Sequence, residues 1–215
     1  MIKTIIFDVG GTLADGPDLY HTISDKVENL HGLRIEAALS EQFGRMYAGK
    51  RFYAVKTILD KITRKILKDS GVEKSKIKAS DVYKDIYLNK SCLFSDSLEI
   101  LDFLKNNGIQ LIIVSDADAD VMIPELKMLK IFDYFDSIII SSDVNCYKTS
   151  KDMANLVNHL LKAPKEQVLF VGNANEDISA AKNLGIKSVF INRVGDKKLG
   201  DITIRSLIEI KNLVN

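Results

Sequence analysis

Few residues of the kinds that build zinc sites occur in this chain. Its 215 residues include 2 cysteines and 3 histidines. Cys92 and Cys146 lie far apart and match no metal-ligand spacing, and the scattered histidines offer no zinc set. We therefore expect both thiols to be ordinary packing residues.

An excess of one charge sign and long apolar runs are also lacking. Lys and Arg number 30 and Asp and Glu 29, so no overall field attracts nucleic acid or anionic lipid, and any anion site must be local. The opening MIKTIIFDVGG reaches an acid after a short apolar run, which predicts neither a signal peptide nor a membrane span. We expect a cytoplasmic protein with no nucleic-acid or membrane partner.

Proline is scarce, with 3 in the whole chain, while hydrophobic residues make up 46%. This composition is typical of a soluble globular protein. A chain of this length can bury a substantial core, so we do not expect disorder to dominate.

Short runs of Ile, Val and Phe recur along the chain, and amphipathic stretches separate the last four of them. Unalternating apolar runs are typical of parallel strands covered by helices on both faces. The pattern predicts an α/β fold with a Rossmann-like, doubly wound parallel sheet. The runs span 2–7, 109–114, 137–141, 167–171 and 187–191, and the helical stretches span 124–129, 152–161 and 177–184.

The rhythm breaks between the first and second runs, where the intervening segment is longer than any simple crossover. This segment reads as helices without a strand pattern; Leu19, Ile23 and Val27, for example, share one helical face. A helix over 96–108 follows, with Gly108 as its stop. We predict a catalytic core formed by residues 1–15 and 92–215, with an all-helical cap inserted at 16–91.

A polar group follows each of the first four apolar runs. Asp8 ends the first and precedes two glycines, which allow a tight turn and bring backbone amides near an anion. Ser115, Lys148 and the pair Asn173 and Asp177 follow the next three. Because parallel strands present their carboxyl ends at one edge of a sheet, these groups are expected to converge there.

Each of these residues also has a purely structural interpretation. Asp8 could form a turn, Ser115 could cap a helix, Lys148 could be a solvated lysine, and Asp177 could be a first-turn helix acid. Their joint occurrence in this order favours a single site.

The order Asp8, Ser115, Lys148 and Asp177 resembles the haloacid dehalogenase superfamily, whose members are mostly phosphatases. The resemblance covers nearly the whole chain, and the helical insert is similar to the cap that many members carry at this point. The four matching segments are IIFDVGGTL, LKNNGIQLIIVSDA, FDYFDSIIISSDV with Lys148, and VLFVGNANEDISAAKNLGI.

The resemblance implies a Mg²⁺-dependent phosphatase that acts on a small phosphorylated metabolite. Asp8 would attack phosphorus to form an aspartyl-phosphate, and Lys148 would offset the clustered acids. Mg²⁺ would neutralise the charge between the attacking anion and the phosphate. The implied metal ligands are Asp8, the carbonyl of Gly10, Asn173 and Asp177, directly or through water, and the implied phosphate or substrate contacts are Gly11, Thr12, Ser115, Asp116, Lys50 and Arg51.

Two residues depart from the family pattern. Gly10 stands where typical phosphatases have a second aspartate, which protonates the leaving group and then activates water. Losing such an acid/base costs typically about 10²–10⁴-fold in rate. Asn173 stands where the fourth motif usually supplies an aspartate to the metal, so the site should hold Mg²⁺ less tightly.

These departures leave several functions open. A specialised phosphatase could act on acyl phosphates, aryl phosphates or anhydrides, or could borrow an acid from the cap. A 2-haloacid dehalogenase needs neither the second aspartate nor Mg²⁺, but it requires an arginine, for which Arg34, Arg45 and Arg51 are candidates. A phosphonate hydrolase would use a cap lysine, and MYAGKRFYAVK offers Lys50 beside Gly49.

A degenerate ligand-binding relative is the remaining alternative, although more polar residues persist than a scaffold needs. The extra acids Asp116 and Asp118 are expected to cap the following helix, or to help hold the cation. The oligomeric state stays open between monomer and homodimer.

Overall fold

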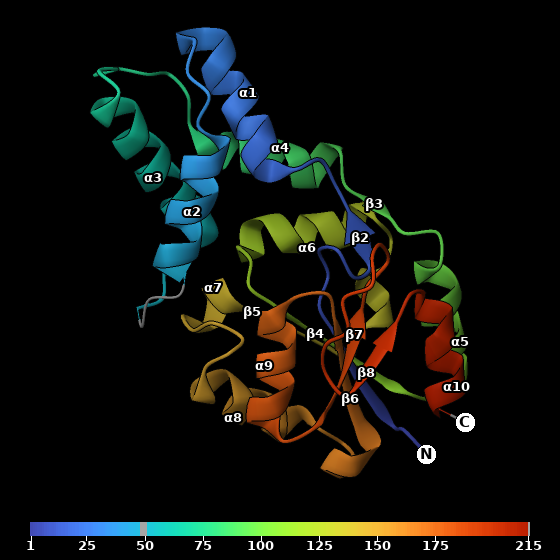
Figure 1. Ribbon diagram of the computed structural model, residues 1–215. Helices are drawn as coiled ribbons and strands as arrows, with labels where there is room; N and C mark the ends of the chain where they lie inside the picture. The colour runs from blue at the N-terminus through green and yellow to red at the C-terminus, as the bar shows by residue number, and fades with distance from the viewer. Residues whose placement is uncertain (48–50, 215) are drawn as a thin grey trace.

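The computed structural model describes residues 1–47 and 51–214. Its main sheet has six parallel strands in the order β5-β4-β1-β6-β7-β8, with β1 at the centre between β4 and β6 (Figure 1). This is the predicted α/β architecture with a Rossmann-like parallel sheet. The strands are β1 (Thr4–Phe7), β4 (Gln110–Ser115), β5 (Ser137–Ile140), β6 (Val168–Gly172), β7 (Lys187–Ile191) and β8 (Ile202–Ile204).

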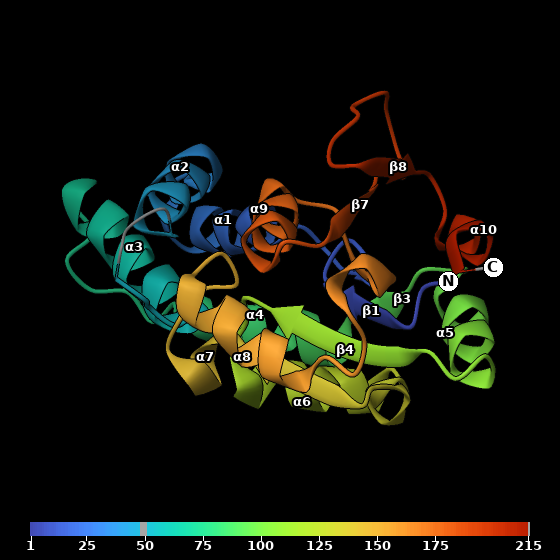
Figure 2. The same cartoon turned by 90° about the horizontal axis from the view of Figure 1, so that it is seen from below.

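Helices cover both faces of the sheet, and the alternation of side chains along β1 shows why its residues are all apolar. Ile5 and Phe7 belong to one buried cluster, together with residues of α5, α6 and α10, whereas Ile6 belongs to a second cluster with α8 and α9. Figure 2 shows α5 and α10 on the opposite side of the sheet from α8 and α9. The helices are α5 (Ser97–Asn106), α6 (Ala119–Met128), α7 (Ser141–Val144), α8 (Lys151–Leu160), α9 (Asn175–Leu184) and α10 (Lys211–Val214), with short 3₁₀ turns η1 (Phe132–Tyr134), η2 (Lys165–Gln167) and η3 (Leu207–Ile210).

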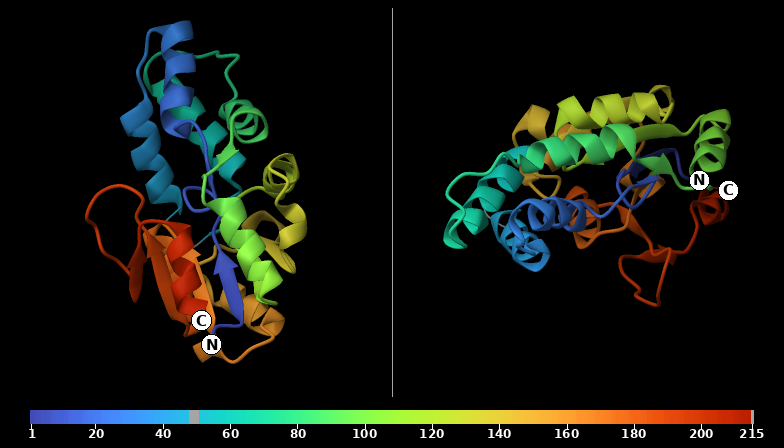
Figure 3. Two further views of the ribbon diagram at one scale, coloured as in Figure 1. Left: turned by 90° about the vertical axis from the view of Figure 1, so that its right-hand side faces the viewer. Right: turned by 90° about the horizontal axis from the view of Figure 1, so that it is seen from above.

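Four helices lie in sequence between β2 (Ala14–Asp15) and β3 (Cys92–Leu93), the two short strands after β1 and before α5. They gather beyond the carboxyl end of the sheet (Figures 1 and 3) and bury their own apolar cluster, which Val121 of α6 joins. All regular structure described between residues 16 and 91 is helical. The helices are α1 (Leu19–His31), α2 (Glu36–Tyr47), α3 (Val55–Asp69) and α4 (Ala79–Asn89).

A two-stranded antiparallel ribbon marks the points where the chain enters and leaves this helical group. β2 (Ala14–Asp15) pairs with β3 (Cys92–Leu93), with Ala14 opposite Leu93 and Asp15 opposite Cys92. The two segments that connect the helical group to the rest of the chain are therefore paired with each other as strands.

Some elements differ from the sequence predictions. The helix expected from Pro124 begins at Ala119, because Val121 and Met122 are buried against the neighbouring helices and extend the helix by about a turn. The short strands β2, β3 and β8 were not predicted. Cys92 is exposed in β3, so its expected packing role is wrong, whereas Cys146 is half-buried. Among the described residues, no helix is long and apolar enough to cross a membrane.

Candidate active site

Asp8 lies directly beyond the central strand, at the carboxyl edge of the sheet. Its amide donates to the carbonyl of Val171 at the end of β6, at 3.0 Å, so the main chain is still held by the neighbouring strand. The side chain is 9% exposed. The sheet thereby presents one nearly buried carboxylate at the position where ligands of open α/β folds bind.

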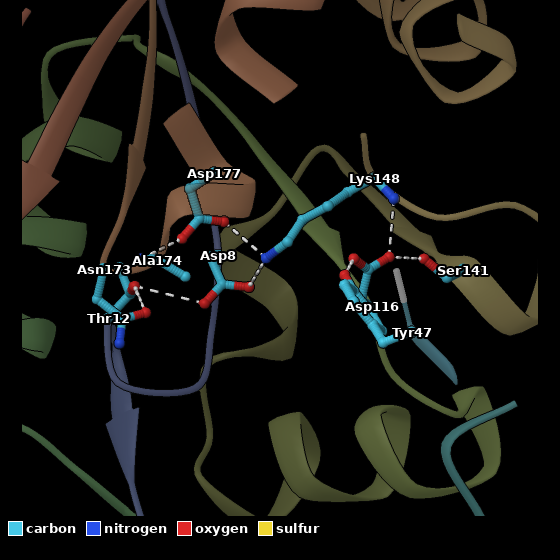
Figure 4. A network of polar contacts seen from close by, with 9 residues as sticks. All are labelled: Asp8, Thr12, Tyr47, Asp116, Ser141, Lys148, Asn173, Ala174 and Asp177. Carbon is cyan, nitrogen blue, oxygen red and sulfur yellow. Dashed lines mark hydrogen bonds and ion pairs between the residues drawn. The ribbon is translucent and has the colours of Figure 1, made fainter. Parts of the chain in front are cut away.

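Lys148 joins Asp8 to Asp177 (Figure 4). Its Nζ lies 3.2 Å from Oδ1 of Asp8 and 2.6 Å from Oδ1 of Asp177, and all three side chains are buried. The other oxygen of Asp177 accepts the amide of Ala174 at 2.8 Å, which closes the first turn of α9. Both oxygens of Asp177 are therefore already bonded, and a part in metal binding through water stays a prediction.

Gly172 explains how Asp177 fits beneath the end of β6. A Cβ at position 172 would lie 2.2 Å from Cγ of Asp177. Only glycine leaves the space that Asp177 needs to reach Lys148.

Burial and charge oppose each other at this group. Burial raises the pKa of Asp8 to about 7, against the lowering effect of Lys148 and together with the repulsion of Asp177. Burial would lower the pKa of Lys148, but Asp8, Asp177 and Asp116 outweigh it and hold that pKa above its usual value. One ammonium thus serves two fully buried carboxylates, which leaves an uncompensated negative charge that a further cation would neutralise.

Asp116 binds protein groups on three sides. It accepts hydrogen bonds from the hydroxyls of Tyr47 and Ser141 and, at 2.8 Å, from the backbone amide of Lys148. Burial raises its pKa, against the lowering effect of Lys148. Asp116 therefore positions the lysine and links it to α2, and its predicted contact with substrate phosphate stays untested.

Asp118 does not cap the helix that follows it, contrary to the prediction. Its carboxylate instead accepts the amide of Lys56, in the first turn of α3, at 2.8 Å. The acid stands at the start of α6, but α3 packs close enough to bring its own unbonded amides to it.

The loop after Asp8 uses its backbone amides internally. The Gly11 amide donates to Ala14 at 2.8 Å and the Thr12 amide to Val9 at 3.1 Å, so neither is free for the phosphoryl oxygens predicted there. The hydroxyl of Thr12 lies 3.5 Å from Oδ2 of Asp8 and 3.3 Å from Oδ1 of Asn173. Gly11 has a φ of +74°, and a Cβ there would lie 2.2 Å from Asn173.

A cavity of about 530 Å³ opens above these residues, between the sheet edge and the helical group. Asp8, Gly10, Ser115, Lys148 and Asn173 all line it. These residues were predicted from the sequence to meet at one edge of the sheet, because each follows a parallel strand, and they do so at this cavity. The wall opposite is largely aromatic and comes from α1, α2 and α4.

Among the described residues, none of the arginines predicted to contact substrate lines this cavity. Arg51 is exposed, and its guanidinium lies 5.3 Å from the centre of the Tyr53 ring. Arg34 pairs with Asp25 and Glu28, and Arg45 with Glu41, on exposed surface. Lys50 and Gly49 lie outside the described residues.

A family model described as haloacid dehalogenase-like hydrolase matches residues 5–191. The chain belongs to this family. Phosphoglycolate phosphatase of Nitrosococcus oceani is 29% identical over 224 residues, covering 99% of this chain and 96% of that protein. Phosphoglycolate phosphatase of Escherichia coli strain K12 is 32% identical over 107 residues, covering 50% of this chain and 42% of that protein. Several curated relatives are thus matched along about half of their length or less.

Solved structures of the haloacid dehalogenase-like fold superpose along the whole chain. L-2-haloacid dehalogenase from Xanthobacter autotrophicus, with chloropropionic acid covalently bound, has a TM-score of 0.77 at 18% identity, covering 100% of this chain and 98% of that one. YfnB from Bacillus subtilis, bound to magnesium, has a TM-score of 0.80 at 18% identity, covering 99% and 98%. These likenesses show the fold alone.

Sequence reasoning missed several residues around the site of this haloacid dehalogenase-like hydrolase. Tyr47 and Ser141, which hold Asp116, follow no motif. Glu176 lines the cavity beside Asn173 but reads in sequence as an ordinary first-turn helix acid. The aromatic residues of α1, α2 and α4 are spread over the insert, and no sequence pattern singled them out.

Proposed function

We propose that this hydrolase is a Mg²⁺-dependent phosphatase that forms an aspartyl-phosphate on Asp8. The observation that carries the proposal is the buried group at the cavity floor, where Lys148 binds Oδ1 of Asp8 and leaves Oδ2 on the side of Thr12 and Asn173. A lysine bonded to one carboxylate oxygen orients the other for attack. The phosphatase names of the relatives agree with this proposal.

The residues around the site fit a hard divalent cation. The Asp8 carboxylate, the Gly10 carbonyl and Asn173 Oδ1 are all oxygen donors, the type that Mg²⁺ prefers, and Mg²⁺ is usually held by one or two carboxylates together with water and substrate phosphate. The uncompensated charge of Asp8 and Asp177 beside a single ammonium also calls for another cation. With one carboxylate among the three donors, the site should depend on the substrate phosphate for much of its metal affinity. When bound, the cation would neutralise charge on the phosphoryl oxygens.

The chain's own residues would then carry two displacements. Oδ2 of Asp8 forms a bond to phosphorus as the bond from phosphorus to the leaving oxygen breaks, and the leaving oxygen takes the electron pair. Water then attacks the aspartyl-phosphate, which releases phosphate and returns the Asp8 carboxylate. Lys148 would offset negative charge throughout, and Ser115, which lines the cavity at the end of β4, would contact a phosphoryl oxygen.

We also propose that residues 16–91 act as a cap over the core formed by residues 1–15 and 92–215. The separate apolar cluster of α1–α4 and the β2–β3 ribbon at the two crossings support this division. A cap in this place would exclude water and select the substrate. A cytoplasmic location, and the choice between monomer and homodimer, stay predictions.

Release of inorganic phosphate tests the proposed function directly. The wild type should cleave acetyl phosphate and p-nitrophenyl phosphate with Mg²⁺, and lose this activity on addition of a chelator. Asp8→Asn should reduce the rate by at least about 10³-fold, because the amide is not a nucleophile. Phosphate release that persists in Asp8→Asn would contradict the proposal.

Carbon–halogen hydrolysis is the second candidate, because Gly10 supplies no acid and halide departure needs none. The described lining of the cavity contains no arginine, however, and Lys148 is already paired. Metal-independent release of halide from a 2-haloacid, without phosphate release from any ester, would favour this candidate over the phosphatase.

A further inference from the structure

We propose that the substrate of this site is a phosphate monoester of an aromatic alcohol that carries no second anionic group. This inference rests on the phosphatase function proposed above. Three independent features support it: the rings of the cavity wall, the charges that line it, and the residue at position 10.

The wall facing Asp8 offers flat apolar surfaces. Phe43 lies between two tyrosines, with its ring centre 5.6 Å from that of Tyr20 and 6.3 Å from that of Tyr47. Tyr83 and Tyr87 of α4 form a second pair at 5.0 Å. All five line the cavity. Aromatic rings pack against one another in offset or edge-on arrangements, so this wall favours a ring-bearing ligand over a small polar one.

The charge of the lining disfavours a second anion. Among the described residues that line the cavity, Lys148 is the only cation, and Asp8 and Asp177 already engage it. Asp116 and Glu176 add carboxylates to the lining. A carboxylate on the substrate would therefore lose its hydration and face like charges without a partner. Phosphoglycolate, the compound in the relatives' name, carries a carboxylate besides its phosphate and therefore lies outside the substrate class proposed here.

The absence of an acid at position 10 selects the leaving group. Gly10 lines the cavity without a side chain, so the departing oxygen must leave without a proton from that position. A phenol, with a pKa of about 10, leaves as a far more stable anion than an ordinary alcohol does. An ester of an aromatic alcohol thus satisfies the wall and the chemistry together. The cavity volume of about 530 Å³ also suits a single small ligand, since such sites span about 300–1,000 Å³.

Matched esters separate these features in a steady-state assay of phosphate release. Phenyl phosphate and benzyl phosphate share a ring but differ in leaving group, so kcat should fall by about 10²-fold or more for benzyl phosphate. The 4-carbamoylphenyl and 4-carboxyphenyl esters share a phenolic leaving group but differ in charge, so KM should be about tenfold or more higher for the carboxyl ester. Equal kcat values in the first pair, or equal KM values in the second, would overturn the proposal.

Variants on one helix test the wall. Phe43→Ala should raise KM for phenyl phosphate several-fold and leave KM for acetyl phosphate, which has no ring, unchanged. Met46→Ala is the matched control, because Met46 is a half-buried apolar residue of α2 that packs against the cap cluster and does not line the cavity. Equal effects of the two variants, at equal melting temperature, would count against a ring-binding wall.

A binding measurement separates this inference from the proposed function. If no ester is cleaved, the phosphatase proposal fails, but the choice of ligand can still be read by calorimetry with phenylphosphonate and phosphonoacetate in the presence of Mg²⁺. Tighter binding of phenylphosphonate supports the inference, and equal or tighter binding of phosphonoacetate overturns it. If esters are cleaved without preference for the neutral aromatic ones, the phosphatase proposal stands and this inference alone fails.

Discussion

At the scale of the residue, the two adjacent glycines in the loop after Asp8 have opposite requirements. A Cβ at Gly10 would meet no atom within 4 Å, and its φ is not in the left-handed region, so the structure tolerates a side chain there. Gly11 has a positive φ, and its Cβ would collide with Asn173. The backbone therefore does not require glycine at position 10, where the family pattern has an acid. At position 11 the backbone does require glycine.

This contrast predicts that alanine lowers the free energy of unfolding by different amounts at the two positions. Gly10→Ala should change the free energy of unfolding by less than about 0.5 kcal/mol, as ordinary surface substitutions do. Gly11→Ala should lower it by about 1–3 kcal/mol because of backbone strain, and should also displace Asn173. Urea denaturation of both variants measures the difference, and equal losses would refute the assignment.

The open space at Gly10 also makes the missing acid restorable. Gly10→Asp should increase kcat on alkyl phosphates by more than on aryl phosphates, because only the former need a proton on the leaving oxygen. Phosphate release from benzyl and phenyl phosphate measures the two gains, with Gly10→Ala as the control for the added side chain. An equal gain on both esters, or none, would contradict the role given to this position.

The single ammonium between two buried acids predicts a large effect of its removal. Lys148→Met leaves Asp8 and Asp177 buried without their partner, which should cost about 3–5 kcal/mol of stability at pH 8. At pH 5 the loss should be smaller, because Asp8, whose pKa burial already raises to about 7, is then protonated. Urea titrations at both pH values test this, with Lys151→Met, at an exposed position in the first turn of α8, as the control. A loss independent of pH would argue against the charge-based explanation.

Glu125 of α6 is a second buried acid with an unusual environment. Its Oε1 accepts the Ser91 hydroxyl at 2.6 Å, while its buried Oε2 has no hydrogen-bond partner among the described residues. Burial raises its pKa from 4.5 to about 7, against the lowering effect of Ser91. A carboxyl with a raised folded-state pKa binds more protons when folded, so the free energy of unfolding falls as pH rises from 4.5 through about 7.

Glu125→Gln should remove that part of the pH dependence. The variant keeps the shape but not the charge, so its stability relative to the wild type should rise between pH 5 and pH 8 by roughly 2–3 kcal/mol. Thermal or urea unfolding across this range measures the difference between the two proteins. A constant difference would mean that Glu125 titrates normally.

At the scale of the element, the segment that leaves β4 holds the helical group through three alternate acids. Asp116 accepts Tyr47 of α2, Asp118 accepts the Lys56 amide of α3, and Asp120 pairs with Lys56 and Lys84. The chain bends after β4 and enters α6 at Ala119, so the acids of this short run contact different helices. The repeated acids of this run therefore fasten the helical group to the end of β4 and to α6.

Of Asp118 and Asp120, Asp118 is expected to contribute more to the stability of the protein. Asp118→Ala removes the acceptor for a first-turn amide of α3, a helix whose own N-cap residue, Ala54, makes no side-chain bond, and should lower stability by about 1–2 kcal/mol. Asp120→Ala breaks half-exposed pairs and should cost less than about 1 kcal/mol. Hydrogen exchange in the first turn of α3 measures the change, and faster exchange only in Asp118→Ala is expected. Equal exchange in both variants would show that the acid does not cap α3.

At the scale of the whole molecule, the sequence predicts the sheet well because its strands are buried on both faces. Each predicted run of the main sheet lies within two residues of an observed strand, from Thr4–Phe7 to Lys187–Ile191. Asp8, Lys148 and Asp177 were predicted to converge, since strand order alone sets which edge they share, and the structure brings them within hydrogen-bonding distance.

Other features depend on contacts between distant segments, which periodicity does not record. The reach of Asp118 to α3 and the pairing of β2 with β3 involve two or three residues each, too few to give a pattern. The direction in which the Thr12 amide points depends on the turn that the Gly11 φ allows. Such local geometry follows from packing rather than from residue type.

The cavity shared by sheet edge and helices predicts that ligand binding stabilises the molecule as a unit. Inorganic phosphate with Mg²⁺, at about 100 times its Kd, should raise the free energy of unfolding by about 2.7 kcal/mol. Differential scanning calorimetry measures this as a higher melting temperature, and Asp8→Asn should bind the pair less tightly. Phosphate without Mg²⁺ is the control, and an equal shift without the metal would contradict a joint site.

The ribbon of β2 and β3 gives the two connections a common mechanical behaviour. Hydrogen bonds between Ala14 and Leu93 and their neighbours resist sliding and splaying of one strand against the other, whereas bending across the ribbon breaks none of them. The two covalent connections of the helical group are thus paired in one ribbon, on which the group can bend once its side-chain contacts with residues 116–120 open. Bending at the ribbon should move the aromatic wall formed by α1, α2 and α4 away from Asp8 in one direction. A disulfide between β2 and β3 should leave this bending motion unchanged.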